Sequence, residues 1–187
     1  MNASTKPRTP PAARSQAFQA ALGKALEGEV RFDAFTRGRY ATDASIYQIM
    51  PRAVAFPRHE GDIAAALQVA GEHGVPVIAR GGGTSQNGQP IGDGLVLDMS
   101  RHFNGVTDYD PQARTVRVRP GTVLTTLNDQ LRKDGLFFPV EPSTASRCTI
   151  GGWRGTTRPG RARCTLARWW TMCWRSTGCC PTASASR

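Results

Sequence analysis

Arg80-Gly81-Gly82-Gly83-Thr84-Ser85 begins the stretch that decides the fold, which runs on to Gln89 and holds four glycines in ten positions. It follows the apolar run Val75-Pro76-Val77-Ile78-Ala79, which predicts a strand that ends in this loop. Glycines adopt positive φ and let successive backbone N–H groups converge on an anion, and Arg80, Thr84 and Ser85 add a charge and two hydroxyl groups. The pattern favours phosphate binding over the alternative, a surface turn.

Two familiar phosphate-binding loops are excluded by spacing. A P-loop ends in Gly-Lys-Ser/Thr, and no lysine occurs between Lys24 and Lys133. A dinucleotide fingerprint would need a glycine at position 86 that opens a helix, but Gln86 is followed by Asn87-Gly88-Gln89-Pro90, which cannot begin a long helix. The loop therefore fits neither a nucleotide triphosphatase nor a Rossmann site.

The residues before the loop predict a strand, a helix and a second strand. Ala53 to Phe56 is an apolar run closed by Pro57, and an acidic start near Glu60 opens a helix that ends with Gly74 in a C-terminal capping position. The expected apolar face of this helix consists of Ile63, Ala66, Leu67 and Ala70. Such a βαβ unit delivers the glycine loop to the carboxyl edge of the sheet, where α/β sheets place ligands.

Further short elements are expected on both sides of this unit. An amphipathic helix over Ala17 to Leu26 has Phe18, Ala21, Leu22 and Leu26 on one face, and Leu95 to Met99 is an apolar strand. Gly105 to Tyr109 and Thr115 to Arg119 form a hairpin, followed by a helix capped by Thr122 that carries Leu124, Leu127 and Leu131 and ends before Gly135. Together these elements predict an α+β domain of two subdomains with a cofactor between them.

From about Tyr40 to Gly152 the chain resembles the FAD-binding, PCMH-type module of the flavin dehydrogenases and oxidases related to vanillyl-alcohol oxidase, a group that includes D-lactate, glycolate and D-2-hydroxyglutarate dehydrogenases. The motifs that carry the resemblance are Pro51 to Pro57, the helix beginning near Glu60, Pro76 to Gln89, Leu95 to Met99, Val118-Arg119-Pro120-Gly121, and Phe138-Pro139 through Pro142-Ser143 to Gly152. The resemblance implies an FAD-dependent oxidoreductase that acts on a small 2-hydroxy acid, with this chain as an inactive N-terminal part of the module that is incomplete at its C-terminal side.

The resemblance also assigns candidate cofactor residues. It implies that the FAD pyrophosphate is held by Gly81, Gly82, Gly83, Thr84 and Ser85, with Arg80, Gly88 and Gln89 at the edge of the site. A second flavin-contacting segment comprises Ser143, Thr149, Ile150, Gly151 and Gly152, for which a loop without a ligand is the alternative. Relatives with covalently bound flavin often carry a histidine where Thr84 stands, so noncovalent FAD is expected. The substrate-binding and catalytic residues of full-length relatives lie in later domains, so no catalytic residue is assigned.

The resemblance stops abruptly after Gly152. Residues 153–187 contain all four tryptophans, four of the five cysteines and seven arginines, but no Asp, Glu or Lys. Read in a shifted frame, the codons of residues 153–158 permit Met-Ala-Gly-Asn-Asn-Ser, which resembles the next motif of the family. We therefore expect a frameshift just after Gly152, and three regions: a leader with a short helix (1–35), the N-terminal part of the FAD-binding domain (36–152) and an out-of-frame tail (153–187).

Charge and cysteine content place few further constraints. The formal net charge of +10 falls to +3 for residues 1–152, where 17 basic residues oppose 14 acidic ones, so nucleic-acid binding is not expected. Cys148 is the only cysteine in that range and predicts a reducing, cytoplasmic compartment. The other cysteines lack Cys-x-x-Cys spacing, and His59, His73 and His102 are far apart, so no metal is expected.

Residues 1–14 are rich in Pro, Ala, Thr and Arg and contain no apolar run suited to a signal peptide or a membrane span. They predict a disordered leader, although the absence of acidic residues before Glu27 leaves an organellar transit peptide as an alternative. Two other functions remain open. One is a sugar or alcohol oxidase, or another flavoenzyme, built on the same module; the other is a non-enzymatic interaction protein that uses the basic tail.

Overall fold

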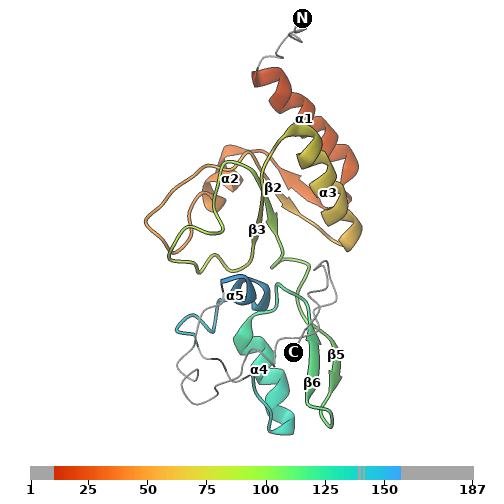
Figure 1. Cartoon of the computed structure of the whole chain (residues 1–187), viewed down its shortest axis with the longest axis vertical. Helices are drawn as coiled ribbons and strands as arrows, with labels where there is room; N and C mark the ends of the chain where they lie inside the picture. Colours follow the sequence, from red (N-terminus) through yellow and green to blue (C-terminus); the bar gives the residue numbers. More distant parts are fainter. Residues whose placement is uncertain (1–10, 139, 141, 157–187) are drawn as a thin grey trace, which may run out of the picture. The chain divides into compact units, whose positions relative to one another are not determined.

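A four-stranded sheet in the order β1-β2-β4-β3 forms the centre of the first unit of the chain (Figure 1). The computed structural model describes residues 11–138, 140 and 142–156, and the chain consists of two units, Met1–Phe103 and Asn104–Arg187. Strands β2 (Ala53–Phe56), β4 (Leu95–Asp98) and β3 (Val77–Arg80) are parallel, and β1 (Glu29–Arg31) pairs antiparallel with β2. Helices and strands are mixed in both units, which confirms the expected α+β class.

The predicted strand, helix and strand before the glycine loop are confirmed as β2, α3 (Glu60–His73) and β3. The two strands of this unit are not neighbours, because β4 lies between them and pairs with both. Gly74 ends α3 with a left-handed φ of 61°, as expected for its capping position. Because β2, β4 and β3 run in the same direction, the residues that follow them emerge at one edge of the sheet.

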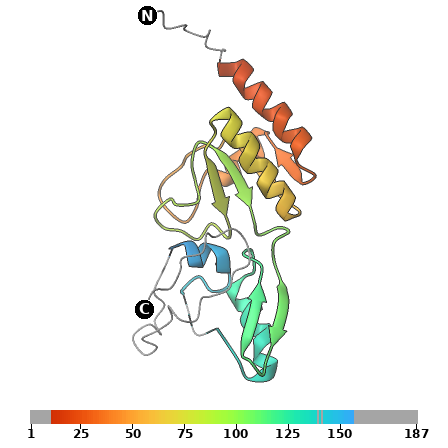
Figure 2. The same cartoon turned by 45° about the vertical axis from the view of Figure 1, so that its right-hand side comes forward.

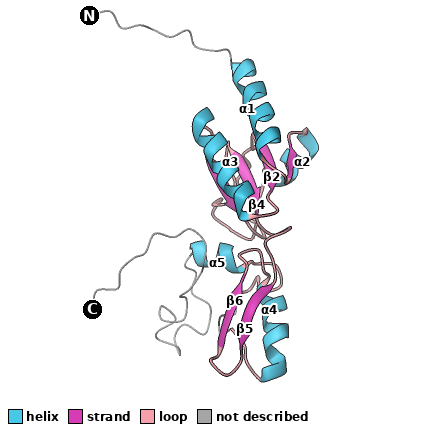
Figure 3. Ribbon diagram, turned by 90° about the vertical axis from the view of Figure 1, so that its right-hand side faces the viewer, coloured by secondary structure: helices cyan, strands magenta, loops and turns pink. Residues whose placement is uncertain are grey.

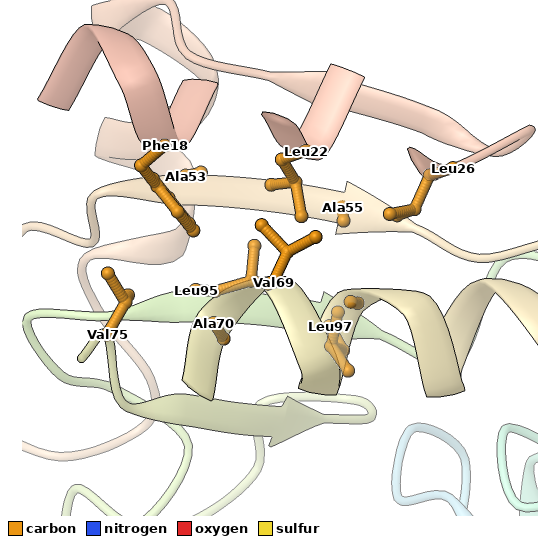
Figure 4. Packing of buried hydrophobic residues seen from close by; sticks show 11 residues of the cluster. Phe18, Leu22, Leu26, Ala53, Ala55, Val69, Ala70, Val75, Leu95 and Leu97 are labelled. Atoms are coloured by element: carbon orange, nitrogen blue, oxygen red, sulfur yellow. The ribbon is translucent and has the colours of Figure 1, made fainter. Parts of the chain in front are cut away.

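The main core lies between this sheet and two helices, α1 (Pro11–Ala25) and α3, which pack side by side (Figures 2 and 4). Side chains alternate along a strand, so Ala53 and Ala55 of β2 face these helices while Val54 and Phe56 face away. The buried members of this core are Phe18, Leu22, Leu26, Ala53, Ala55, Ala66, Val69, Ala70, Val75, Leu95 and Leu97. On the opposite face, Tyr40 of α2 (Ala34–Tyr40) packs against Val54, Phe56 and Val96.

The first helix is longer than its periodicity predicts. It begins at Pro11, because proline is tolerated in the first turn of a helix and the residues that follow it are mostly good helix formers. Residues 11–14 of the expected leader are therefore helical, while residues 1–10 lie outside the described part of the chain. On α3 the predicted face is wrong at Leu67, whose side chain is 51% exposed, and Val69 is buried in its place.

The start of α3 is held by a buried carboxylate that the sequence reading did not single out. Asp62 is 1% exposed and accepts backbone N–H groups from Glu27 at 2.8 Å, Gly28 at 3.1 Å and Arg58 at 2.7 Å. His59 caps the helix, since its Nδ1 accepts the backbone N–H of Asp62 at 3.2 Å. Asp62 thereby joins the turn between α1 and β1 to the beginning of α3.

The described part of the second unit contains a hairpin and short helical segments (Figure 3). The hairpin is confirmed as β5 (Val106–Asp110) paired with β6 (Thr115–Val118), and the segments are α4 (Leu124–Leu131), the 3-10 helix η1 (Arg132–Asp134) and α5 (Ile150–Thr156). The expected apolar face of α4 is also confirmed, because Leu124, Leu127 and Leu131 are buried. Within the described residues, no helix has the length and apolar character needed to cross a membrane.

The predicted cap of α4 is wrong. Val123 occupies the capping position, and no side chain there makes a capping hydrogen bond. The Thr122 hydroxyl instead donates to the carbonyl of Arg119 at 2.7 Å and lies 2.9 Å from the backbone N of Gly105, which donates to it. Thr122 therefore stabilises the turn before α4 and joins it to the start of the hairpin.

Candidate functional site

The glycine loop starts where β3 ends, at the carboxyl edge of the parallel strands. Gly83 has a φ of +65°, and a Cβ atom on this residue would lie 2.6 Å from Nη2 of Arg80. The positive φ favours glycine at position 83, and a Cβ atom there would also displace the guanidinium group of Arg80. Gly82 is exposed, so loop backbone is accessible beside this tight contact.

The guanidinium group of Arg80, at the start of this loop, turns toward the protein and contacts backbone carbonyl groups. Its Nη1 donates to the carbonyl oxygens of Tyr40 at 3.3 Å and Pro90 at 3.4 Å, and its guanidinium carbon lies 5.1 Å from the centre of the Tyr40 ring. Burial of the guanidinium lowers the pKa of Arg80, an effect that nearby Tyr40, Asp43 and Asp98 oppose. The side chain thus supports the loop from inside the protein.

Tyr40 and Asp98 extend this support into the sheet. The Tyr40 hydroxyl donates a hydrogen bond to Asp98, which is 6% exposed and also accepts the backbone N–H and the hydroxyl of Ser100 at 2.7 and 2.6 Å. Burial of the phenol, together with the hydrogen bond to the Asp98 carboxylate, raises the pKa of Tyr40. Asp98 pairs with Arg80 across β4 and β3, so these three side chains form one cluster at the strand ends.

A second loop, over residues 41–50, packs against the glycine loop. Ala44 donates its backbone N–H to the carbonyl of Gly83 at 3.1 Å, and the Tyr47 ring lies against Gly88, whose φ is +73°. The loop is closed on itself by a bridge between Thr42 and Gln48. Its large apolar side chains remain exposed, Ile46 by 95%. The sequence reading did not assign this loop to the site, because the contact joins segments that are about 40 residues apart.

The hydroxyl-bearing residues of the glycine loop are half-buried. Thr84 and Ser85 lie between the exposed residues Gly82 and Gln86, and the Ser85 hydroxyl oxygen accepts the backbone N–H of Asn87 at 3.2 Å. That hydrogen bond makes a local turn and leaves the Ser85 O–H as a donor. The eight candidates of the first set, Arg80, Gly81, Gly82, Gly83, Thr84, Ser85, Gly88 and Gln89, thus belong to one loop.

The second set of candidates lies in the other unit, around the start of α5. Ser143 is exposed in a turn, whereas Thr149 is buried and forms a bridge with Val123. Ile150 and Gly151 donate their backbone N–H groups to the carbonyls of Thr122 at 2.9 Å and Pro120 at 2.8 Å. A Cβ atom on residue 151 would lie 2.6 Å from Cβ of Pro120, so this close approach requires glycine.

The Thr149 hydroxyl and the Cys148 thiol are both buried in this segment. The Thr149 hydroxyl oxygen has no hydrogen-bond partner among the described residues, and such an orphaned group is suited to a ligand contact. Cys148 is a free, buried cysteine, and burial raises the pKa of its thiol. Helix α5 continues past the boundary expected after Gly152, and the Trp153 ring meets that of Phe138 edge-on at 5.5 Å. Residues 157–187 of the expected tail lie outside the described part.

The residues present fit a flavin dinucleotide better than a metal. The first set offers a glycine-dependent loop with accessible backbone and hydroxyl groups, which is the donor chemistry that binds phosphate oxygens. Among residues 11–138, 140 and 142–156, no three His, Cys, Asp or Glu side chains come together in a way that would hold a metal ion. Phosphate recognition by the glycine loop is therefore the chemistry that the site supports.

Comparison with known proteins agrees with phosphate recognition by the glycine loop. A sequence model of a family described as FAD binding domain matches residues 51–166. D-2-hydroxyglutarate dehydrogenase of Pseudomonas putida is 41% identical over 84% of the chain, and the glycolate oxidase subunit GlcD of Bacillus subtilis is 37% identical over 68%. The chain spans 16% and 28% of the lengths of these two relatives. A solved structure of alkyldihydroxyacetonephosphate synthase shares the fold, with a TM-score of 0.69 at 21% identity over 86% of the chain and 32% of that structure.

Proposed function

The chain belongs to the FAD binding domain family, whose sequence model matches residues 51–166, and we propose that it is the FAD-binding part of an oxidoreductase that acts on a small 2-hydroxy acid. The observation that carries the substrate class is the similarity to a D-2-hydroxyglutarate dehydrogenase and a glycolate oxidase subunit, since both are named for 2-hydroxy acids. A cytoplasmic location belongs to the same proposal and is supported by the single free cysteine in residues 1–152.

In this proposal the glycine loop holds the pyrophosphate of FAD. Backbone N–H groups of Gly81, Gly82 and Gly83 and the hydroxyl groups of Thr84 and Ser85 act as donors, with Gly88 and Gln89 beside them. Arg80 belongs to the same site. Ser143, Thr149, Ile150, Gly151 and Gly152 form the second contact, which the orphaned Thr149 hydroxyl supports.

The residues of this chain bind and orient the cofactor. FAD, once bound, supplies the hydride-accepting chemistry of the reaction. The loop donors stabilise the pyrophosphate by hydrogen bonds, and the sequence has no lysine between Lys24 and Lys133. Threonine at position 84 carries no ring nitrogen that could bond to the flavin, so noncovalent binding is part of the proposal. No residue of the chain is assigned a catalytic role.

The frameshift expected after Gly152 remains a proposal and has a direct test. Resequencing the genomic DNA across the codons for Thr149 to Arg187, and beyond the stop, should restore Met-Ala-Gly-Asn-Asn-Ser and a long open frame by a change of one base. An unchanged sequence excludes an error of reading, so that any frameshift lies in the gene itself and the product is a truncated fragment that includes residues 153–187.

The substrate class is tested with the protein encoded by the resequenced gene. Its FAD-bound form is mixed anaerobically with D-2-hydroxyglutarate, D-lactate or glycolate, and loss of oxidised flavin absorbance is followed. The proposal predicts bleaching by at least one of these acids and none by sugars or simple alcohols. Bleaching by a sugar or an alcohol alone would support the other flavoenzymes instead.

A further inference from the structure

We propose that Arg80 is a positioning residue, which holds the glycine loop in its binding conformation and does not act as the charge that meets the FAD pyrophosphate. This inference rests on the proposed function of the same loop. It concerns how one arginine, which adjoins three glycines in the sequence, contributes to binding.

The first support is the direction of the guanidinium group. Arg80 is the first residue of the loop, and Nη1 donates to the carbonyl of Pro90, the residue just after its end. The same nitrogen also donates to the carbonyl of Tyr40 at the end of α2. One side chain therefore joins the start of the loop to its end and both to a neighbouring helix. An arginine suits this task because its planar group presents several donors in a fixed geometry.

The second support is the contact with Gly83. Nη2 of Arg80 lies 2.6 Å from the place that a Cβ atom at position 83 would take, so the guanidinium group lies close to the loop backbone. The loop is also held by Ala44, whose backbone N–H donates to the Gly83 carbonyl. Gly83 is thus held both by Arg80 and by the loop over residues 41–50.

The third support is the surrounding charge. The carboxylates of Asp43 and Asp98 act electrostatically on Arg80, and its guanidinium carbon lies over the Tyr40 ring. One carboxylate oxygen of Asp43 is buried without a hydrogen-bond partner among the described residues, so its negative charge is little screened there. These nearby negative charges oppose the effect of burial on the Arg80 guanidinium group, and in our proposal the anion is met by the backbone N–H groups of the loop.

Hydrogen exchange of the Ala44 amide tests whether Arg80 stabilises the glycine loop, because this amide donates to the Gly83 carbonyl. The exchange is followed by NMR in the 187-residue chain without FAD. Arg80→Lys keeps the charge but loses the planar group, and it should accelerate this exchange about tenfold, because local opening becomes easier. Arg58→Lys, at an exposed arginine before α3, is the matched control and should leave the rate unchanged. Unchanged Ala44 exchange in Arg80→Lys would overturn the inference.

FAD titration of the same proteins separates positioning from direct charge recognition. Positioning predicts that Arg80→Lys and Arg80→Gln both bind FAD about tenfold more weakly, with the salt dependence of the wild type, since the charges at the anion are unchanged. Near wild-type affinity in Arg80→Lys, with weaker salt dependence in Arg80→Gln, would assign the arginine to the anion and overturn the proposal.

Tyr40→Leu removes the ring under Arg80 and provides an independent variant if the lysine variant does not fold. It should weaken FAD binding to a similar degree, and Tyr40→Leu/Arg80→Lys should lose little more than either single change, because both act through one contact. Additive losses would contradict a shared role. Failure of the wild-type chain to bind FAD would count against the proposed function, whereas Ala44 exchange would still decide the role of Arg80.

Discussion

Gly83 and Arg80 are fitted to one another, because a Cβ atom on residue 83 would lie 2.6 Å from Nη2 of Arg80 and 3.1 Å from its guanidinium carbon. The left-handed φ of +65° at Gly83 adds a backbone restriction that side chains rarely accept. The start of the loop is thereby specified by a pair of residues, and the glycine serves packing as well as ligand access.

This relationship predicts the effect of Gly83→Ala. The change should lower the free energy of unfolding by about 1–2 kcal/mol, since it adds strain at positive φ and displaces the guanidinium group. Gly71→Ala is the matched control, because this exposed helical glycine has nothing within 4 Å of the added Cβ, and it should raise stability by about 0.5–1 kcal/mol. Chemical denaturation measures both, and equal effects of the two changes would contradict the steric argument.

Asp62→Asn should destabilise the first unit. The buried carboxylate accepts three backbone N–H groups, and hydrogen bonds to a charged group each contribute about 1.5–3 kcal/mol, so a loss of about 2 kcal/mol is expected when the charge is removed. Asp93→Asn serves as the control, because the Asp93 side chain is 61% exposed in its ion pair with Arg52 and should contribute less than about 1 kcal/mol.

The contribution of Asp62 should depend on pH. Burial alone would raise the pKa of Asp62, but hydrogen bonds from the backbone N–H groups of Arg58, Glu27 and Gly28 and the nearby His59 lower it below the ordinary value of 3.8. The stabilisation is therefore fully present above this value and is lost as the pH falls through the lower pKa of the folded state. Denaturation of wild type and Asp62→Asn between neutral pH and pH 3 should show a converging difference. A difference that stays constant would show that the charge is not responsible.

Leu22→Ala tests the core between α1 and the sheet. Leu22 is fully buried, and large-to-small changes at such positions cost about 2–5 kcal/mol of unfolding free energy. Leu67→Ala removes the same atoms from a half-exposed side chain on α3 and should cost less than about 1 kcal/mol. Equal losses, measured by denaturation, would mean that α1 does not cover the sheet in solution.

Thr84 predicts that the cofactor is released on denaturation. Acid precipitation of the FAD-bound chain should leave all flavin in the supernatant, because no ring nitrogen at this position can bond to it. Absorbance of the supernatant and of the redissolved pellet measures the two fractions. Flavin that stays with the pellet would contradict noncovalent binding.

Local sequence patterns were sufficient to predict most helices and strands of the first unit. Helical spacing identified the buried face of α1, and the apolar runs of β2 and β4 identified two central strands. The pattern failed at Leu67, because its place at the edge of the α3 face depends on where α1 and the sheet lie, which a single helix does not specify. Thr122 was predicted as a cap, but its hydroxyl finds partners in the preceding turn instead.

The glycine loop of the candidate site could be predicted from the sequence, but the contacts that hold this loop in place could not. Glycines, hydroxyl groups and the preceding strand are visible in residues 75–89. The contacts of Arg80 with Tyr40, and of Gly83 with Ala44, join residues about 40 positions apart, so they arise only from tertiary packing. Similarly, Asp62 appears in the sequence as an acidic residue of a first helical turn, and its burial depends on the turn at Glu27 and Gly28.

Equilibrium titration of FAD into the 187-residue chain, read by flavin fluorescence and repeated with Gly83→Ala, tests the FAD site most directly. Saturable binding is expected for the wild type, with competition by ADP, which shares the pyrophosphate, and at least about tenfold weaker binding by Gly83→Ala. Absence of saturable binding, or equal affinity of Gly83→Ala and wild type, would contradict FAD recognition by the glycine loop.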